Sequence, residues 1–177
     1  MRNKIKLSFS GHQTFALRNG WLKKVVDALS ENNEISTGNI FNAEETIARF
    51  GVGKNMVEAM GFWAFACGLI EADKRKATNL GKYLFAQESG VDQYLEDEAT
   101  LWLLHWLLSS NISICSTWYF CFHELARINF EKSHLKNAVN KYALDLQGRE
   151  PNQTTLAKDI DCFINTYVIR KGKRGEV

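Results

Sequence analysis

The chain has 177 residues, of which 45% are hydrophobic and 24% are charged, and its formal net charge is +2. This composition excludes an intrinsically disordered chain, which would combine low hydrophobicity with high net charge. It fits one globular domain, or two small ones that share a core. The single proline argues against a turn-rich β-sandwich and favours long helices. The near-balance of charge neither requires nor excludes a nucleic-acid partner, because phosphate binding depends on where positive charges lie.

The sequence also indicates the compartment. Its N-terminus lacks the continuous apolar stretch and small-residue cleavage site of a signal peptide. The densest apolar runs, GFWAFACGLI and LWLLHWLL, have ten and eight residues, well short of the roughly 20 that span a bilayer. The four cysteines stand in apolar stretches, so we expect reduced core residues rather than disulfides. A cytoplasmic protein without a membrane partner is predicted.

Three helices are predicted in the first 70 residues. Apolar residues at helical spacing place the first helix from Leu17 to Leu29. Asn42 is the expected cap of a second helix over residues 43–50. After Gly51-Val52-Gly53, helical spacing resumes over residues 54–70. Two helices joined by a short glycine-containing turn are typical of a helix-turn-helix.

The segment GLIEADKRKATNLGKYLF predicts a short strand, a basic tip at Lys74, Arg75 and Lys76, a return segment and another helix. Residues 1–90 are therefore predicted to form a winged helix-turn-helix with a small β-hairpin wing. They carry 12 basic and 9 acidic residues (+3), whereas residues 91–177 carry 10 and 11 (-1). The positive excess thus falls in the predicted winged helix.

Residues 91–177 are predicted to form a helical domain packed on the first. The run LWLLHWLL is apolar on nearly every face, which predicts a buried helix. Two further amphipathic helices are expected in KSHLKNAVNKYALDLQ and TTLAKDIDCFINTYV, with Pro151 between them. The predicted fold class is mainly α, with a bundle-like helical extension after the winged helix.

The candidate DNA-binding residues fall in three groups. Lys54 and Asn55 open the predicted recognition helix, where side chains reach base edges or phosphates; the alternative is an exposed turn of a purely structural winged helix. Lys74, Arg75 and Lys76 would follow a phosphate backbone, or form an ordinary charged turn. His12, Gln13 and Arg18 stand between aromatic residues and form either a polar patch for phosphate, base or protein, or a turn that caps the first helix.

No metal, cofactor or catalytic residue is assigned from the sequence. His105, Cys115, Cys121 and His123 lack the spacing of a zinc site, and no phosphate-binding loop or hydrolase motif is present. Asp159 and Asp161 resemble part of a nuclease carboxylate cluster, but no third ligand stands at a suitable spacing. A solvated helix face is the simpler interpretation of these two acids.

The strings FSGHQTFALRNGWLKK and GVGKNM resemble the opening signature and a later block of the bacterial family named domain of unknown function 4007. The resemblance implies a DNA-binding component of an Ssp-type DNA phosphorothioation or phage-defence system. It also implies a longer protein, because family members continue past the length of this chain, and part of the function is then expected in a further C-terminal portion.

Two alternatives stay open at this stage. The first is a DNA nickase of the same system, with His12 or the pair Asp159 and Asp161 as candidate chemistry. The second is a protein-interaction module, in which the winged helix binds a partner ATPase or sulfur-transfer enzyme instead of DNA. DNA, and other proteins of a modification or defence cluster, are therefore the expected partners.

Overall fold

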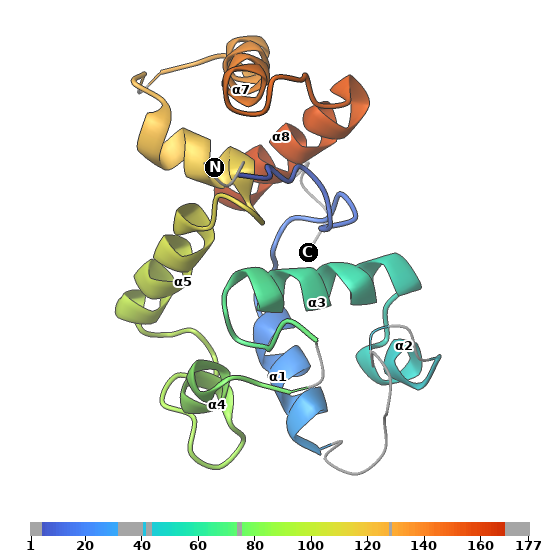
Figure 1. The fold of residues 1–177 in the computed structure, drawn as a ribbon. Coiled ribbons are helices and arrows are strands. Elements are labelled where there is room, and N and C mark those ends of the chain that lie inside the picture. The colour runs from blue at the N-terminus through green and yellow to red at the C-terminus, as the bar shows by residue number, and fades with distance from the viewer. Residues whose placement is uncertain (1–4, 32–40, 42–43, 74–75, 128, 169–177) are drawn as a thin grey trace, which may run out of the picture.

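The computed structural model describes residues 5–31, 41, 44–73, 76–127 and 129–168, and in these ranges it is helical, as Figure 1 shows. The elements in chain order are α1 (Trp21–Glu31), α2 (Glu44–Phe50), α3 (Lys54–Ala66), α4 (Asn79–Phe85), α5 (Glu98–Ser110), α6 (Ser116–Tyr119), the π-helical turn η2 (Phe120–Glu124), α7 (Lys132–Gln147) and α8 (Gln153–Tyr167). The predicted mainly α class is confirmed. Within these ranges every helix is too short or too polar to cross a membrane.

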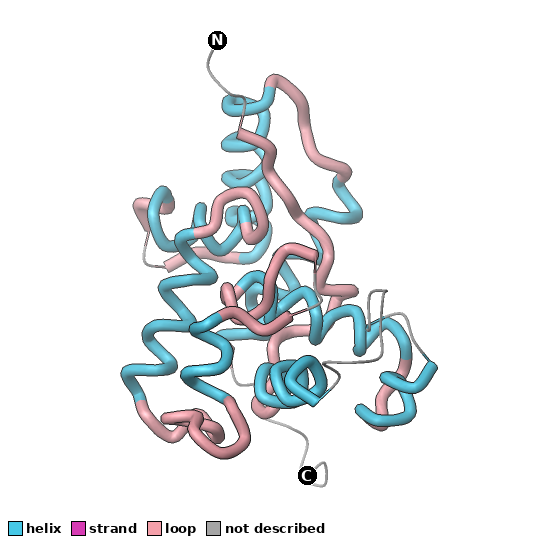
Figure 2. Tube along the Cα trace, turned by 60° about the horizontal axis from the view of Figure 1, so that its bottom comes forward, coloured by secondary structure: helices cyan, strands magenta, loops and turns pink. Residues whose placement is uncertain are grey.

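The prediction of a β-hairpin wing after α3 is wrong. The described part of this segment has no strand, as Figure 2 shows, and holds only an isolated antiparallel bridge between Ile70 and Ala77. The Thr78 hydroxyl donates to the carbonyl of Gly68 at 2.8 Å and accepts from the amide of Gly81, as the cap of α4. Because the next helix is capped so soon after the bridge, no room is left for a ladder. Of the predicted wing tip, residues 74–75 lie outside the described residues.

The helix before the bridge is central to the fold. Eight of the 13 residues of α3 are buried, and the helix packs against α1 and α2. The indole Nε1 of Trp63 donates to the carbonyl oxygen of Phe15 at 2.9 Å, which ties the helix to the N-terminal segment. Only the first turn, with Lys54 and Asn55, is exposed. α3 is thus a core helix that reaches the surface at its N-terminal end.

The N-terminal segment joins the two predicted parts of the chain. Before entering α1 it runs beside the second half of the molecule (Figure 1). The Ser8 amide donates to the hydroxyl of Ser116 at 2.7 Å, and the Ser116 amide donates to the carbonyl of Ser8 at 3.3 Å. Apolar residues from both predicted parts belong to one core.

α5 differs from the predicted fully buried helix. Thr100, Leu104 and Leu108 lie four residues apart on a buried face. Trp102 and Trp106, also four apart, lie on the opposite face and are 69% and 60% exposed. The two tryptophans therefore contribute little to the core that this helix covers.

The contact of α4 with the segment after α3 can be tested at Gly81. A Cβ atom there would lie 2.2 Å from the carbonyl oxygen of Leu69. Helix propensity alone would make Gly81→Ala stabilising by about 1 kcal/mol. Because backbone atoms would have to move, we expect instead a loss of about 2 kcal/mol. Urea denaturation measures the difference; the neighbouring exposed Lys82→Ala serves as the control and should stay within about 0.5 kcal/mol of the wild type. A stabilised Gly81→Ala variant would contradict this packing.

Candidate functional site

The exposed end of α3 is the first candidate site. Its cap residue, Gly53, provides no side-chain hydrogen bond, and the first turn contains no acidic residue. The first amides of a helix lack intrahelical partners and carry partial positive charge, so such an end favours anions. Lys54 and Asn55 project from this turn and are exposed. The structure therefore presents these two predicted residues together at an uncapped helix terminus.

Gln13 lies at the same end of α3. Its side-chain amide Nε2 donates to Oε2 of Glu58 at 2.7 Å, and Glu58 stands one helical turn after Lys54. The backbone of Gln13 and Thr14 has left-handed φ angles of 48° and 66°, which non-glycine residues seldom adopt. The local turn thus brings the Gln13 side chain to the first turns of α3, where it forms a hydrogen bond with the Glu58 carboxylate.

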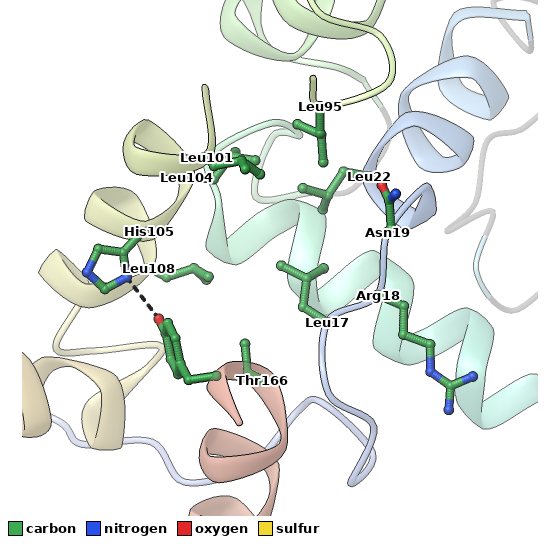
Figure 3. A pocket seen from close by; sticks show the side chains of 11 residues that line it. Leu17, Arg18, Asn19, Leu22, Leu95, Leu101, Leu104, His105, Leu108 and Thr166 are labelled. Atoms are coloured by element: carbon green, nitrogen blue, oxygen red, sulfur yellow. Dashed lines mark hydrogen bonds between the residues drawn. The ribbon is translucent and has the colours of Figure 1, made fainter. Parts of the chain in front are cut away.

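Of the other predicted basic residues, the structure describes Arg18 and Lys76. Arg18 is exposed, with its guanidinium carbon 5.5 Å from the ring centroid of Trp21, and in Figure 3 its guanidinium points away from the leucines of the adjacent hollow. Lys76 is exposed beyond the opposite end of α3, and a 13-residue helix is about 20 Å long. Lys74 and Arg75 lie outside the described residues.

His12 does not belong to the exposed surface. It is 3% exposed, and its ring stacks on Trp63 with centroids 6.0 Å apart. The Thr14 amide donates to Nδ1 at 3.0 Å, so the ring hydrogen is on Nε2, which donates to Oδ1 of Asp159 at 2.8 Å. The Thr117 hydroxyl donates to the other carboxylate oxygen at 2.5 Å. Because both ring nitrogens are used inside the core, His12 cannot meet a DNA phosphate in this arrangement.

The two late aspartates do not form a pair. Asp159 faces inward and is 3% exposed, whereas Asp161 is at the surface and accepts a salt bridge from Nζ of Lys132 at 2.5 Å. Across the part of the chain that the structure describes, no three His, Cys, Asp or Glu side chains are grouped to hold a metal ion. The sequence-based expectation that both acids lie on a solvated face is therefore right for Asp161 and wrong for Asp159.

The cysteines are protonated thiols at neutral pH. Burial raises the pKa of Cys67 to about 12. Burial, and then the negative charge of Asp159, raise the pKa of Cys121 to about 12. Since the thiolate is the form that attacks electrophiles and binds metals, these thiols are unreactive in the folded protein.

The hydrogen bond between His12 and Asp159 joins residues 147 positions apart and was missed in the sequence. One signal was available. Asp159 follows Leu156 by three positions and precedes Phe163 by four, which places it on the buried face of α8. A carboxylate on an apolar face requires a hydrogen-bond partner, but the sequence did not indicate that the partner was His12.

These features define the class of protein: a small helical fold with a buried histidine–aspartate hydrogen bond and an α3 whose exposed N-terminal end has no side-chain cap. The family described as "Protein of unknown function (DUF4007)" matches residues 9–176, so the chain belongs to that family. Two similar solved structures are "Magnesium ion-bound SspB crystal structure" (TM-score 0.72) and "SspB crystal structure" (TM-score 0.70); each is 32% identical, covering 89% of this chain and 48% of the other. The chain thus spans about half the length of these structures. No curated protein matches it.

A double-mutant cycle tests the buried hydrogen bond. His12→Ala leaves a buried carboxylate without its ring partner, and we expect a loss of about 3 kcal/mol of unfolding free energy. Asp159→Ala should cost a similar amount. The double variant should lose less unfolding free energy than the sum of the two single losses, with a coupling energy of about 1–3 kcal/mol. Urea denaturation followed by tryptophan fluorescence gives all four values, and simple additivity would show that the two side chains do not interact.

Proposed function

We propose that this protein is a DNA-binding component of a bacterial DNA phosphorothioation or phage-defence system. The likeness to SspB, a phosphorothioation-system protein, supports the system. The single observation that supports DNA contact is the exposed, uncapped end of α3, which carries Lys54 and Asn55. Because the chain spans about half of the SspB structures, the proposal concerns binding by this part and not a complete activity.

The proposed contact is to the DNA backbone. The backbone amides of Lys54 and Asn55, which begin the helix, and the ammonium of Lys54 suit a phosphate, while the Asn55 side-chain amide can reach a second phosphate or a base edge. Because most of α3 is buried, the helix meets DNA with its end and not along its length. Gln13, which lies at the same end of α3, would add a contact beside this point. Such an interface binds with strong salt dependence and weak sequence preference.

The two late aspartates do not fit a magnesium site. One SspB structure contains a magnesium ion according to its description. Magnesium prefers carboxylate and other oxygen ligands. In this chain both oxygens of Asp159 accept hydrogen bonds from His12 and Thr117, and Asp161 is paired with Lys132. The nickase alternative therefore has no supporting ligand cluster among the described residues, and we derive no cleavage step for them.

Salt-dependent binding tests the proposal. A fluorescein-labelled 20-base-pair duplex is titrated with protein from 50 to 300 mM NaCl, and fluorescence anisotropy reports binding. We expect Lys54→Ala with Asn55→Ala to weaken binding for all duplex sequences. We also expect the slope of log affinity against log salt to fall in magnitude by about one, because one phosphate contact is lost.

The matched control is Lys141→Ala, which removes an equal charge from an exposed site on α7 and should leave the affinity nearly unchanged. An equal loss in the control would show that only total charge matters. If the wild type does not bind duplex at 50 mM NaCl, or the double variant binds like the wild type, the proposed contact is wrong.

A further inference from the structure

An aromatic groove lies between α5, η2 and the C-terminal end of α8. It consists of three adjoining hollows of about 350, 590 and 560 Å³, and Tyr167 lines all of them. Leu101 and His105 are shared by the first two, and Phe122 by the last two. Figure 3 shows the first hollow, with His105 of α5 among its lining residues. The shared lining residues place the three hollows next to one another around Tyr167, and we call them together the aromatic groove.

The side chains of the aromatic groove are unusually exposed for their size. Trp102, Phe122 and Tyr167 are large and apolar, yet all three are exposed. Trp106, one turn after Trp102 on the same helix, is exposed beside them. Soluble proteins seldom leave a contiguous patch of this kind uncovered unless it binds something. Tryptophan and tyrosine are also the residues that most often dominate binding energy in protein interfaces.

The floor of the aromatic groove carries no charge at neutral pH. Burial, and then the nearby His123, lower the pKa of His105, so its ring is neutral at pH 7. Burial raises the pKa of Tyr167, whose hydroxyl lies 3.0 Å from Nδ1 of His105. Nδ1 of His105 and the Tyr167 hydroxyl are thus paired with each other, and Leu101, Trp102 and Phe122 supply the apolar surface beside them.

The rim of the aromatic groove indicates the chemistry of the partner. Glu98 lines the middle hollow, and the exposed Glu96 and Asp97 precede it directly. At the opposite end, Lys132 is neutralised by its salt bridge to Asp161. Among the lining residues, Glu98 is the charged residue of the middle hollow, and Arg18 lines the first hollow. At the middle hollow, the Glu98 carboxylate repels a nucleic-acid phosphate and attracts a Lys or Arg of a protein segment.

We propose that the aromatic groove binds an amphipathic helix of a partner protein. The helix would place large apolar side chains against Trp102, Phe122 and Tyr167, and a Lys or Arg beside Glu98. This is the helix-in-groove mode, in which a few apolar anchors supply affinity and charges at the rim set orientation. The aromatic groove is separate from the exposed end of α3, so this inference does not depend on DNA binding.

Two matched peptides test the aromatic groove. The first is a fluorescein-labelled 16-residue helix with leucines on one face and lysines at one end, and the second carries glutamates in place of the lysines. We expect the lysine peptide to bind at least tenfold more tightly. Trp102→Ala with Phe122→Ala should weaken it tenfold or more, without loss of helical circular dichroism, because both side chains are exposed. Glu98→Gln should reduce the ratio of the two peptides' affinities to less than fivefold, because it removes the charge that attracts the lysines.

The control is Tyr83→Ala with Tyr94→Ala, which removes two exposed aromatic rings that do not line the aromatic groove and should change the affinity by less than twofold. Equal binding of the lysine peptide to the wild type and to the Trp102 and Phe122 double variant would overturn the proposal. The proposal would also be overturned if the wild type bound a 15-nucleotide oligo-dT and the double variant did not. The same holds if the wild type formed a dimer and the double variant were a monomer. The last two outcomes would assign the aromatic groove to single-stranded DNA or to a second copy. Duplex binding through Lys54 should be unaffected by these changes, which separates the two proposals.

Discussion

The structure depends on the hydrogen bond between His12 and Asp159. A carboxylate buried among apolar side chains is costly unless its oxygens accept hydrogen bonds, and here both do, from His12 and Thr117. These three residues belong to the N-terminal segment, α8 and α6, and the His12 ring also stacks on Trp63 of α3. One polar cluster therefore joins four parts of the chain that are distant in sequence.

This constraint determines which surfaces are free to act. Since the N-terminal segment covers the middle of α3, that helix cannot lie along a DNA groove, and only its first turn reaches solvent. The same packing holds α8 beside η2 and α5, where Tyr167, Phe122 and Trp102 are left exposed. The proposed DNA contact and the proposed protein contact are thus separate surfaces fixed by the same core.

Local patterns in the sequence predicted much of the fold. Helical spacing placed α2 and α3 within one residue of their observed starts, because glycines separate them and their apolar residues recur at helical intervals. The first helix was expected from Leu17, but begins at Trp21. The prediction of a β-hairpin wing was wrong because Thr78 caps the next helix before a strand can form. Periodicity describes each element well, but the length of a connection depends on the caps at both ends.

The site was harder to predict, because it depends on contacts between distant residues. A histidine ring can bind a phosphate at the surface or form a buried hydrogen bond, so the sequence around His12 fits both roles. The position of Asp159 in the fold shows that His12 forms the buried hydrogen bond. Trp102 and Trp106 looked like core residues within an apolar run, since a sequence does not show which face of such a helix meets a neighbour. Lys54 and Asn55 were found at the surface because they follow a glycine turn at a helix start.

The most direct measurement of the central claim is the hydrogen position on the His12 ring. Long-range proton–nitrogen correlation spectra of uniformly ¹⁵N-labelled protein at pH 7 can assign it, with the exposed His134 as an internal reference. The structure predicts one tautomer for His12, with hydrogen on Nε2, an unprotonated Nδ1 and slow exchange of the ring hydrogen with water. Hydrogen on Nδ1, or averaged signals like those expected of His134, would contradict the account.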